Sequence, residues 1–228
     1  VYYGKHDSSK VKTYVSVNAI NAVDKDLAPV HRISQIADIS AEFCRVIFNQ
    51  KLTTTAVNRA VEIARSLQEC VIEDVKCTRS LLLLAQNNPD MYFHSGRVAA
   101  YAVAIALQNG EQNSHRLTEI ALGCLLHDIG NNKLSPEIMN KPGMLSASEW
   151  SEVHKHPEFG HQQILHAVLT AIPREIVLHH HERLDGSGYP HGLSKDRILP
   201  EVSIAALADV FDSLISDRPY RPARKPYE

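Results

Sequence analysis

The side chains best suited to chemistry are an adjacent histidine and aspartate, His127 and Asp128, which follow the apolar run 121–126. Helical spacing puts His127 on the same face as Ile120 and Cys124, so it predicts that the pair lies at the buried end of an amphipathic helix. A neutral imidazole beside a carboxylate suits a divalent metal such as iron, manganese or zinc. Taken alone, such a dipeptide is more often a capped helix end with a surface acid, so the remaining histidines decide the interpretation.

The chain has 13 histidines, and eleven of them fall between positions 94 and 191. Histidines clustered with acids are the usual material of metal and acid–base sites. The candidate ligands stand on different expected helices or helix ends: His94, His127, Asp128, His156, His180, His181 and Asp209. Helical bundles build metal sites in this way, from side chains that project inward from several helices.

This set has too many nitrogen and oxygen donors for one structural zinc, and it contains no cysteine. It fits two adjacent divalent metals bridged by a carboxylate such as Asp128. Two metals about 3.5–4 Å apart clamp the attacking and leaving oxygens of a phosphoryl displacement. Asp209 supports this interpretation, because a carboxylate inside the apolar stripe of a helix is costly unless it is paired or bound to metal.

The elements that must position these residues are helices, and the pattern predicts an all-α fold. Apolar spacing of three and four residues predicts helices over 29–48 and 53–84. Pro200 opens the last clear helix, in which we expect Leu207 and Leu214 to be buried.

The first 27 residues show no helical stripe and fit a short strand, a hairpin or an ordered tail equally well. We therefore expect a small, mostly helical N-terminal module in residues 1–77, with a regulatory or dimerising role, and a second domain in residues 78–228.

Composition excludes several classes of protein. Of the 228 residues, 44% are hydrophobic and 22% charged, so the chain can bury a substantial core. The net charge of −2 does not indicate a surface that binds nucleic acid. No apolar run reaches the roughly 18 residues of a membrane span, and no signal peptide is recognisable. We expect the four cysteines to be reduced and mostly buried in a cytoplasmic protein. The first residue is not Met, so we expect a fragment of something longer.

Four stretches of the chain together resemble the HD-GYP family, a branch of the HD phosphohydrolase superfamily. These stretches are His127-Asp128-Ile129-Gly130, His180-His181-Glu182-x-x-Asp185-Gly186-x-Gly188-Tyr189-Pro190, Asp209-Val210-Phe211-Asp212 and Arg218-Pro219-Tyr220-Arg221. The resemblance covers residues 78–228 and implies an HD-type helical bundle. It further implies a bacterial, cytoplasmic, metal-dependent phosphodiesterase that opens cyclic di-GMP to pGpG, with further cleavage to GMP in some members.

The resemblance also implies roles for single residues. The family's ligands for two metals, iron or manganese, fall on the seven candidate ligands, and an acid for a third metal in some members falls on Asp90. The substrate-binding positions fall on Gly188, Tyr189, Pro190, Arg218 and Arg221. The implied mechanism has a metal-bridging hydroxide attacking phosphorus in line with the departing 3′ oxygen. As partners we expect cyclic di-GMP and either a second copy of the chain or a signalling protein.

One position departs from the family pattern. The family reads His-Asp-x-Gly-Lys, and this chain has Asn131 where the lysine belongs. A cation there would stabilise charge that develops near the scissile phosphate, whereas Asn donates a hydrogen bond without charge. Lys133 lies two residues on and is expected to point elsewhere. The chain also ends soon after Arg221, so we expect the terminal helices of the domain to be missing.

Three functional interpretations follow. An active phosphodiesterase is favoured, with Asn131 counted beside His127 and Asp128 in the catalytic group. A catalytically weak or inactive module that senses cyclic di-GMP or binds partner proteins is the alternative, and Asn131 is its main support. A general HD-type nucleotidase is disfavoured by the intact Gly188-Tyr189-Pro190 loop.

Overall fold

The computed structural model describes residues 23, 26–48, 50, 52–87, 91–139 and 141–216, and within this part the chain is all-α, as predicted. Two segments of extended backbone meet in one isolated bridge, between Asp185 and Ser194. The expected strand or tail before residue 23, Asp90, Arg218 and Arg221 lie outside the described residues.

The α-helices, in chain order, are α2 (Pro29–Ile47), α3 (Thr54–Glu73), α4 (Thr78–Asn87), α5 (Met91–Gln108), α6 (Ser114–Leu126), α7 (Pro136–Met139), α8 (Ala147–Val153), α9 (His156–Ile164), α10 (Ala171–His179) and α11 (Pro200–Ile215). Short 3-10 helices are η2 (Val75–Cys77), η3 (Ile129–Lys133) and η4 (Lys195–Arg197).

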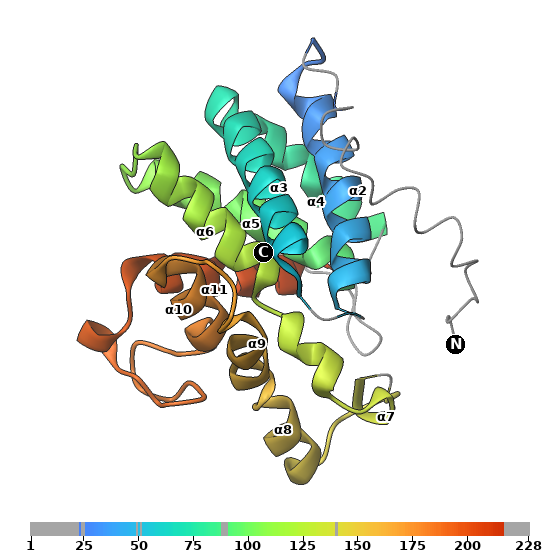
Figure 1. The fold of residues 1–228 in the computed structure, drawn as a ribbon, viewed down its shortest axis with the longest axis vertical. Helices are drawn as coiled ribbons and strands as arrows, with labels where there is room; N and C mark the ends of the chain where they lie inside the picture. The colour runs from blue at the N-terminus through green and yellow to red at the C-terminus, as the bar shows by residue number, and fades with distance from the viewer. Residues whose placement is uncertain are drawn as a thin grey trace.

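Helices α2 to α6 form the larger group of Figure 1, and α7 to α9 extend from it at the other end of the molecule. Helix α5 packs against α2, α6 and α11, and α6 packs against α3 and α10. One continuous hydrophobic core therefore runs through α2, α3, α5, α6, α10 and α11. The division of the chain at residue 77 stays a prediction, and helices from both sides of it share this core.

Local sequence signals explain where several helices begin. Thr53 caps α3, because its side chain accepts a hydrogen bond from the Ala56 backbone N–H. Ser146 and Glu149 form a capping box at the start of α8. The four cysteines are free and buried, as predicted.

The expected burial of Leu207 and Leu214 is wrong, since 56% and 37% of these residues are exposed. Helix α11 instead turns Ala208, Asp209 and Asp212 inward. The two carboxylates have hydrogen-bond and charge partners inside the molecule, described below. These partners offset the free-energy cost of burying the charges.

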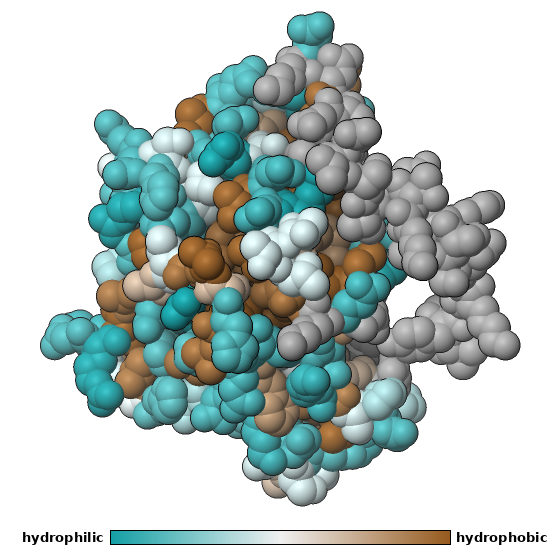
Figure 2. Space-filling model, in the orientation of Figure 1, coloured by the Kyte–Doolittle hydropathy of each residue, from teal (hydrophilic) through white to brown (hydrophobic). Residues whose placement is uncertain are grey.

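Figure 2 shows apolar residues gathered in the middle of one face, with hydrophilic residues around them. Of the helices that the structure describes, none combines the length and the apolar character that crossing a membrane requires.

Gly130 allows η3 to cross the start of α9 at very short range. A Cβ atom at this position would lie 1.9 Å from the carbonyl oxygen of His156 and 2.5 Å from the backbone nitrogen of Gly160. Both atoms belong to the backbone, so neither can move aside cheaply. This close approach brings the segment after Asp128 against the helix that carries His156.

We therefore expect Gly130→Ala to lower the free energy of unfolding by about 3 kcal/mol or more, because overpacked backbone cannot relax locally. Gly143→Ala is the matched control: its φ of 103° strains alanine, but no atom lies within 4 Å of the added Cβ. The control should cost about 1 kcal/mol. Chemical denaturation of both variants measures the difference, and equal losses would contradict the close packing of η3 on α9.

Candidate metal centre

Four of the predicted ligands come together where three helices end or begin. Asp128, His156, His180 and His181 each offer one ligand atom, and these atoms lie within 4.8 Å of one another. Asp128 directly follows α6 and His127, His156 opens α9, and His180 and His181 follow α10. Side chains far apart in the sequence thus meet where these helices end or begin.

A second group lies beside the first. Its members are His94 on α5, His127 after α6 and Asp209 on α11, all buried, and their ligand atoms also lie within 4.8 Å of one another. The rings of His94 and His127 are 5.3 Å apart between centroids, and those of His127 and His180 are 4.8 Å apart. All seven candidate ligands therefore belong to one cluster with two parts.

Asp128 stands between the two groups. Its Oδ2 lies 3.4 Å from Nε2 of His127, and its Oδ1 lies 3.4 Å from Nε2 of His156 and 4.0 Å from Nε2 of His180. The two oxygens of one carboxylate thus face different groups.

Hydrogen bonds at Nδ1 fix the direction of the imidazoles. Nδ1 of His127 donates to the carbonyl oxygen of Cys124 over 2.6 Å, and Nδ1 of His156 donates to that of Val153 over 2.7 Å. A carbonyl can only accept, so Nδ1 carries the proton and Nε2 keeps its lone pair. In metal-binding histidines, the ring nitrogen that does not bind the metal typically donates such a hydrogen bond.

His180 follows the same rule, because its Nδ1 lies 3.1 Å from the carbonyl oxygens of Ile176 and Val177. Its Nε2 is then an acceptor, and it lies only 3.2 Å from Nε2 of His156. Two lone pairs face each other across this distance. A cation bound by both nitrogens removes the repulsion, so the donor set fits a metal ion.

The fourth buried histidine of the centre, His94, is held by a carboxylate. Its Nδ1 donates to Oδ2 of Asp212 over 2.7 Å, and its Nε2 lies 3.1 Å from Oδ1 of Asp209. Arg97 in turn donates to Asp212 through Nε over 2.7 Å and through a terminal nitrogen over 2.9 Å. The sequence places Asp212 one turn after Asp209 on an apolar helix, where a carboxylate needs a partner, but it does not identify His94 and Arg97 as the partners.

Burial and neighbouring charges shift the pKa values of these histidines in opposite directions. Burial opposes charge on His94, but its hydrogen bonds to Asp209 and Asp212 prevail and raise its pKa to about 9. Burial lowers the pKa of His181 to about 2, and the pKa values of His156 and His180 also fall for that reason.

The carboxylates stay ionised. Burial opposes the charge of Asp128, but the nearby imidazoles, first His127 and then His156, hold its pKa well below the usual range. The pKa of Asp209 is lowered against the effect of burial by its hydrogen bond to His94. The centre therefore presents negative oxygens and, in the four-residue group, neutral imidazoles, as a divalent cation requires.

The glycine-rich loop is tied to this centre. Tyr189 stacks on His181, with centroids 4.6 Å apart, and on His154, with centroids 3.9 Å apart. A Cβ at Gly188 would lie 2.4 Å from the backbone nitrogen of Arg183, so only glycine fits there. The stacking of His154 on Tyr189 depends on tertiary packing, and no local pattern in the sequence signals it.

Glu182 holds the far side of the same loop. Its Oε1 accepts from the backbone N–H of His191 over 2.7 Å, and its Oε2 accepts from that of Leu193 over 2.9 Å. The loop that contains Gly188, Tyr189 and Pro190 therefore returns to the residues that directly follow His180 and His181.

The position of the missing lysine is part of η3. Asn131 is half-buried, and its backbone N–H donates to the carbonyl oxygen of Asp128 over 3.0 Å. Lys133 is exposed at the end of the same turn. This exposure agrees with the expectation that Lys133 points elsewhere.

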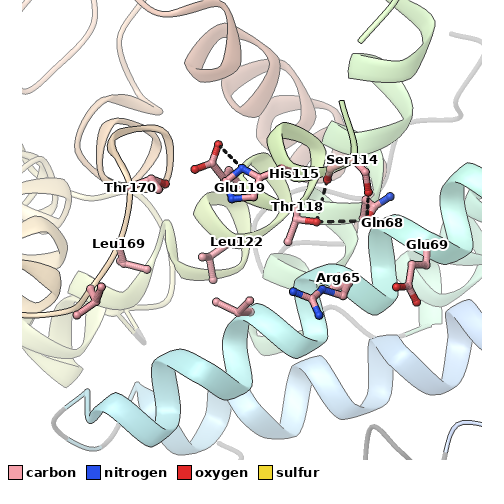
Figure 3. Close-up of a pocket in the computed structure, with 12 residues that line it drawn as sticks. Arg65, Gln68, Glu69, Ser114, His115, Thr118, Glu119, Leu122, Leu169 and Thr170 are labelled. Atoms are coloured by element: carbon pink, nitrogen blue, oxygen red, sulfur yellow. Dashed lines mark hydrogen bonds and ion pairs between the residues drawn. The ribbon is translucent and has the colours of Figure 1, made fainter. Parts of the chain in front are cut away.

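A pocket of about 440 Å³ lies apart from the ligand groups, between α3, α6 and the segment before α10 (Figure 3). In it, Gln68 accepts hydrogen bonds from Ser114 over 3.3 Å and from Thr118 over 3.2 Å. None of the seven candidate ligands lines this pocket, so it is no part of the metal centre.

Comparison with known families and curated proteins agrees with the fold and the site. The HD domain family matches residues 81–228. The cyclic di-GMP phosphodiesterase PA4108 of Pseudomonas aeruginosa is 36% identical over 163 residues, which are 71% of this chain and 39% of that protein. The 3'3'-cGAMP-specific phosphodiesterase 3 of Vibrio cholerae is 38% identical over 130 residues, 57% of this chain and 28% of that protein. The chain thus spans less than half the length of these curated relatives.

Among solved structures, Bd1817, an HDG"Y"P protein from Bdellovibrio bacteriovorus, superposes with a TM-score of 0.78 and 19% identity. The match covers 94% of this chain and 71% of that one. At this identity the likeness concerns the fold, and it confirms the predicted helical architecture.

The raised pKa of His94, about 9 in the metal-free protein, predicts that metal binding releases protons at pH 7. The imidazolium must lose a proton before Nε2 can bind a cation. His156, His180 and His181 release none, since their pKa values are lowered and their rings are already neutral. Metal affinity should therefore rise between pH 7 and pH 9 and then level off.

Calorimetry of manganese binding at pH 7, in two buffers with different ionisation enthalpies, measures the protons released. We expect a clear release at pH 7 and almost none at pH 10. A binding heat at pH 7 that does not depend on the buffer would contradict the charge assigned to His94.

Proposed function

Because this chain belongs to the HD-GYP branch of the HD domain family, we propose that it is a metal-dependent phosphodiesterase that opens cyclic di-GMP to pGpG and can cleave further to GMP. One observation carries the proposal: two adjacent ligand groups face the two oxygens of Asp128. Cyclic dinucleotide phosphodiesterase activity is named for both curated relatives described above.

We propose that the centre holds two divalent ions, iron or manganese, which suit its nitrogen and carboxylate donors. His94, His127 and Asp209 would hold one ion, His156, His180 and His181 the other, and Asp128 would bridge them. When bound, the ions supply Lewis-acid polarisation of the phosphate and an activated water.

The chain's own residues supply orientation. The Nδ1 hydrogen bonds of His127, His156 and His180 aim the Nε2 atoms before any ion arrives, which lowers the entropy cost of assembling the site. Stacking of Tyr189 between His154 and His181 holds the glycine-rich loop beside the ligands. Substrate contact by Gly188, Tyr189 and Pro190 is part of the proposal.

Further parts of the proposal concern residues and partners outside this geometry. Arg218 and Arg221 would neutralise the substrate phosphates, and Asp90 would serve a third ion. Residues 1–77 would regulate the enzyme through a second copy of the chain or a signalling protein. We propose a bacterial cytoplasmic setting, where a cyclic dinucleotide messenger is available.

A second candidate function is a module that binds cyclic di-GMP without efficient turnover. Asn131 favours it, because a half-buried amide stands where the family has a cation, and the exposed Lys133 offers no replacement near Asp128. A binding module would use the same metal ligands as the enzyme, so a measurement of turnover is needed to distinguish the two functions.

Asp128→Asn tests the role of the shared carboxylate. The variant loses the negative charge that faces both groups, so we expect hydrolysis of cyclic di-GMP by the manganese-loaded protein to fall about 100-fold or more. Asp196→Asn, at an exposed position of η4, should leave the rate unchanged. Product formation is followed by chromatography, with 3'3'-cGAMP as a parallel substrate, and no product from either substrate with manganese or iron would contradict the proposed enzyme.

Asn131→Lys tests the departure from the family. A cation restored at this position should stabilise developing charge and raise the turnover number about 10-fold or more. Asn132→Lys adds the same charge one residue further, at an exposed position, and serves as the matched control. An equal rise in turnover in both variants would show that added positive charge near the centre, and not its position at residue 131, causes the effect. No rise in either variant would show that Asn131 does not limit turnover.

A further inference from the structure

A second histidine cluster lies outside the two ligand groups, at the end of α10 and in the loop that follows it. Nε2 of His179 lies 3.0 Å from Nδ1 of His191, and Nδ1 of His179 lies 2.8 Å from Oε2 of Glu175. His161 on α9 interacts electrostatically with Glu175, His179 and His191, so a third imidazole stands near them. The metal centre uses none of these residues.

The carboxylate decides which nitrogen of His179 is free. Glu175 accepts the Nδ1–H of His179, so the Nε2 of His179 carries a lone pair that points at His191. This is the arrangement in which a carboxylate orients an imidazole and raises its basicity for a metal ion.

The geometry of the two imidazoles fits one cation with small movement. Two nitrogens bound tetrahedrally to zinc at about 2.0–2.1 Å stand roughly 3.3 Å apart. The observed separation is 3.0 Å, and the ring planes are inclined by 61° with centroids 5.2 Å apart. The pair has to open by only a few tenths of an ångström, and the exposed His191 can move toward solvent.

Proton balance does not oppose binding. In the hydrogen bond between the rings, His191 donates its Nδ1–H to His179. Binding of a cation at Nδ1 of His191 requires the tautomer that carries the proton on Nε2 instead.

We propose that His179 and His191 form a separate site for zinc, with Glu175 as the positioning residue and water completing the coordination. His191 directly follows the Tyr189-Pro190 pair, and its backbone is held by Glu182. Zinc at this site would therefore tie the glycine-rich loop to the end of α10, in addition to the stacking of Tyr189 on His181. The site does not depend on the proposed hydrolysis.

The test measures zinc bound in addition to the centre. The 228-residue chain, loaded with manganese, is equilibrated with zinc, desalted, and analysed for both metals in the same sample. Zinc that replaces manganese in the centre is counted equally in every variant, so the comparison between variants isolates the new site.

We expect the wild-type chain to hold one more equivalent of zinc than His191→Asn. The imidazole of His191 is exposed, so this variant should keep its fold, which circular dichroism checks. His115→Asn is the matched control, because His115 also pairs with a glutamate, Glu119, at 3.4 Å but has no second imidazole in that pair. It should bind as much zinc as the wild type.

Glu175→Gln keeps both imidazoles and removes the orienting charge, so zinc affinity should fall about 10-fold with the stoichiometry unchanged. Equal zinc content in the wild type and His191→Asn would overturn the site. Unchanged affinity in Glu175→Gln would overturn the role of the carboxylate. Neither result depends on turnover, so a failure here is distinct from a failure of the proposed enzyme.

Discussion

The direction of four buried imidazoles is the constraint on which the candidate metal centre depends. Three of them donate Nδ1–H to backbone carbonyls at helix ends, and His94 donates to the carboxylate of Asp212. In the first three, Nε2 of the neutral ring keeps its lone pair for a cation, whereas Nε2 of His94 faces Asp209 and must first lose its proton. The helix ends therefore hold lone pairs in place before an ion binds, and the 3.2 Å contact between His156 and His180 shows how closely they are assembled.

The fold supports this constraint through buried polar contacts rather than through its apolar core alone. Arg97, only 1% exposed, pairs with Asp212 and so joins α5 to α11 behind His94. Removing either charge would break an ion pair that is almost fully buried, which is costly. On the opposite side, Gly130 lets η3 approach α9, and Tyr189 ties the glycine-rich loop to His181. Metal ligation and loop position are thereby parts of one packed unit.

The sequence was informative where a local pattern has a fixed structural meaning. A histidine and an aspartate after an apolar helix, taken together with the other histidines, predict a shared centre, and the family resemblance assigns the glycine-rich loop to it. The inward stripe of α11 was predicted only in part: Asp209 lies on it as expected, but Leu207 is exposed, because the position of the stripe depends on partners that other helices supply. The stacking of His154 on Tyr189 and the contact of His179 with His191 likewise depend on tertiary packing that no periodicity encodes.

The central claim is that the seven ligand candidates form one centre for two ions. Anomalous X-ray diffraction from crystals of the manganese-loaded chain tests it most directly. We predict two strong peaks, one among His94, His127 and Asp209 and one among His156, His180 and His181, with Asp128 between them. A single peak, or peaks outside these residues, would contradict the account.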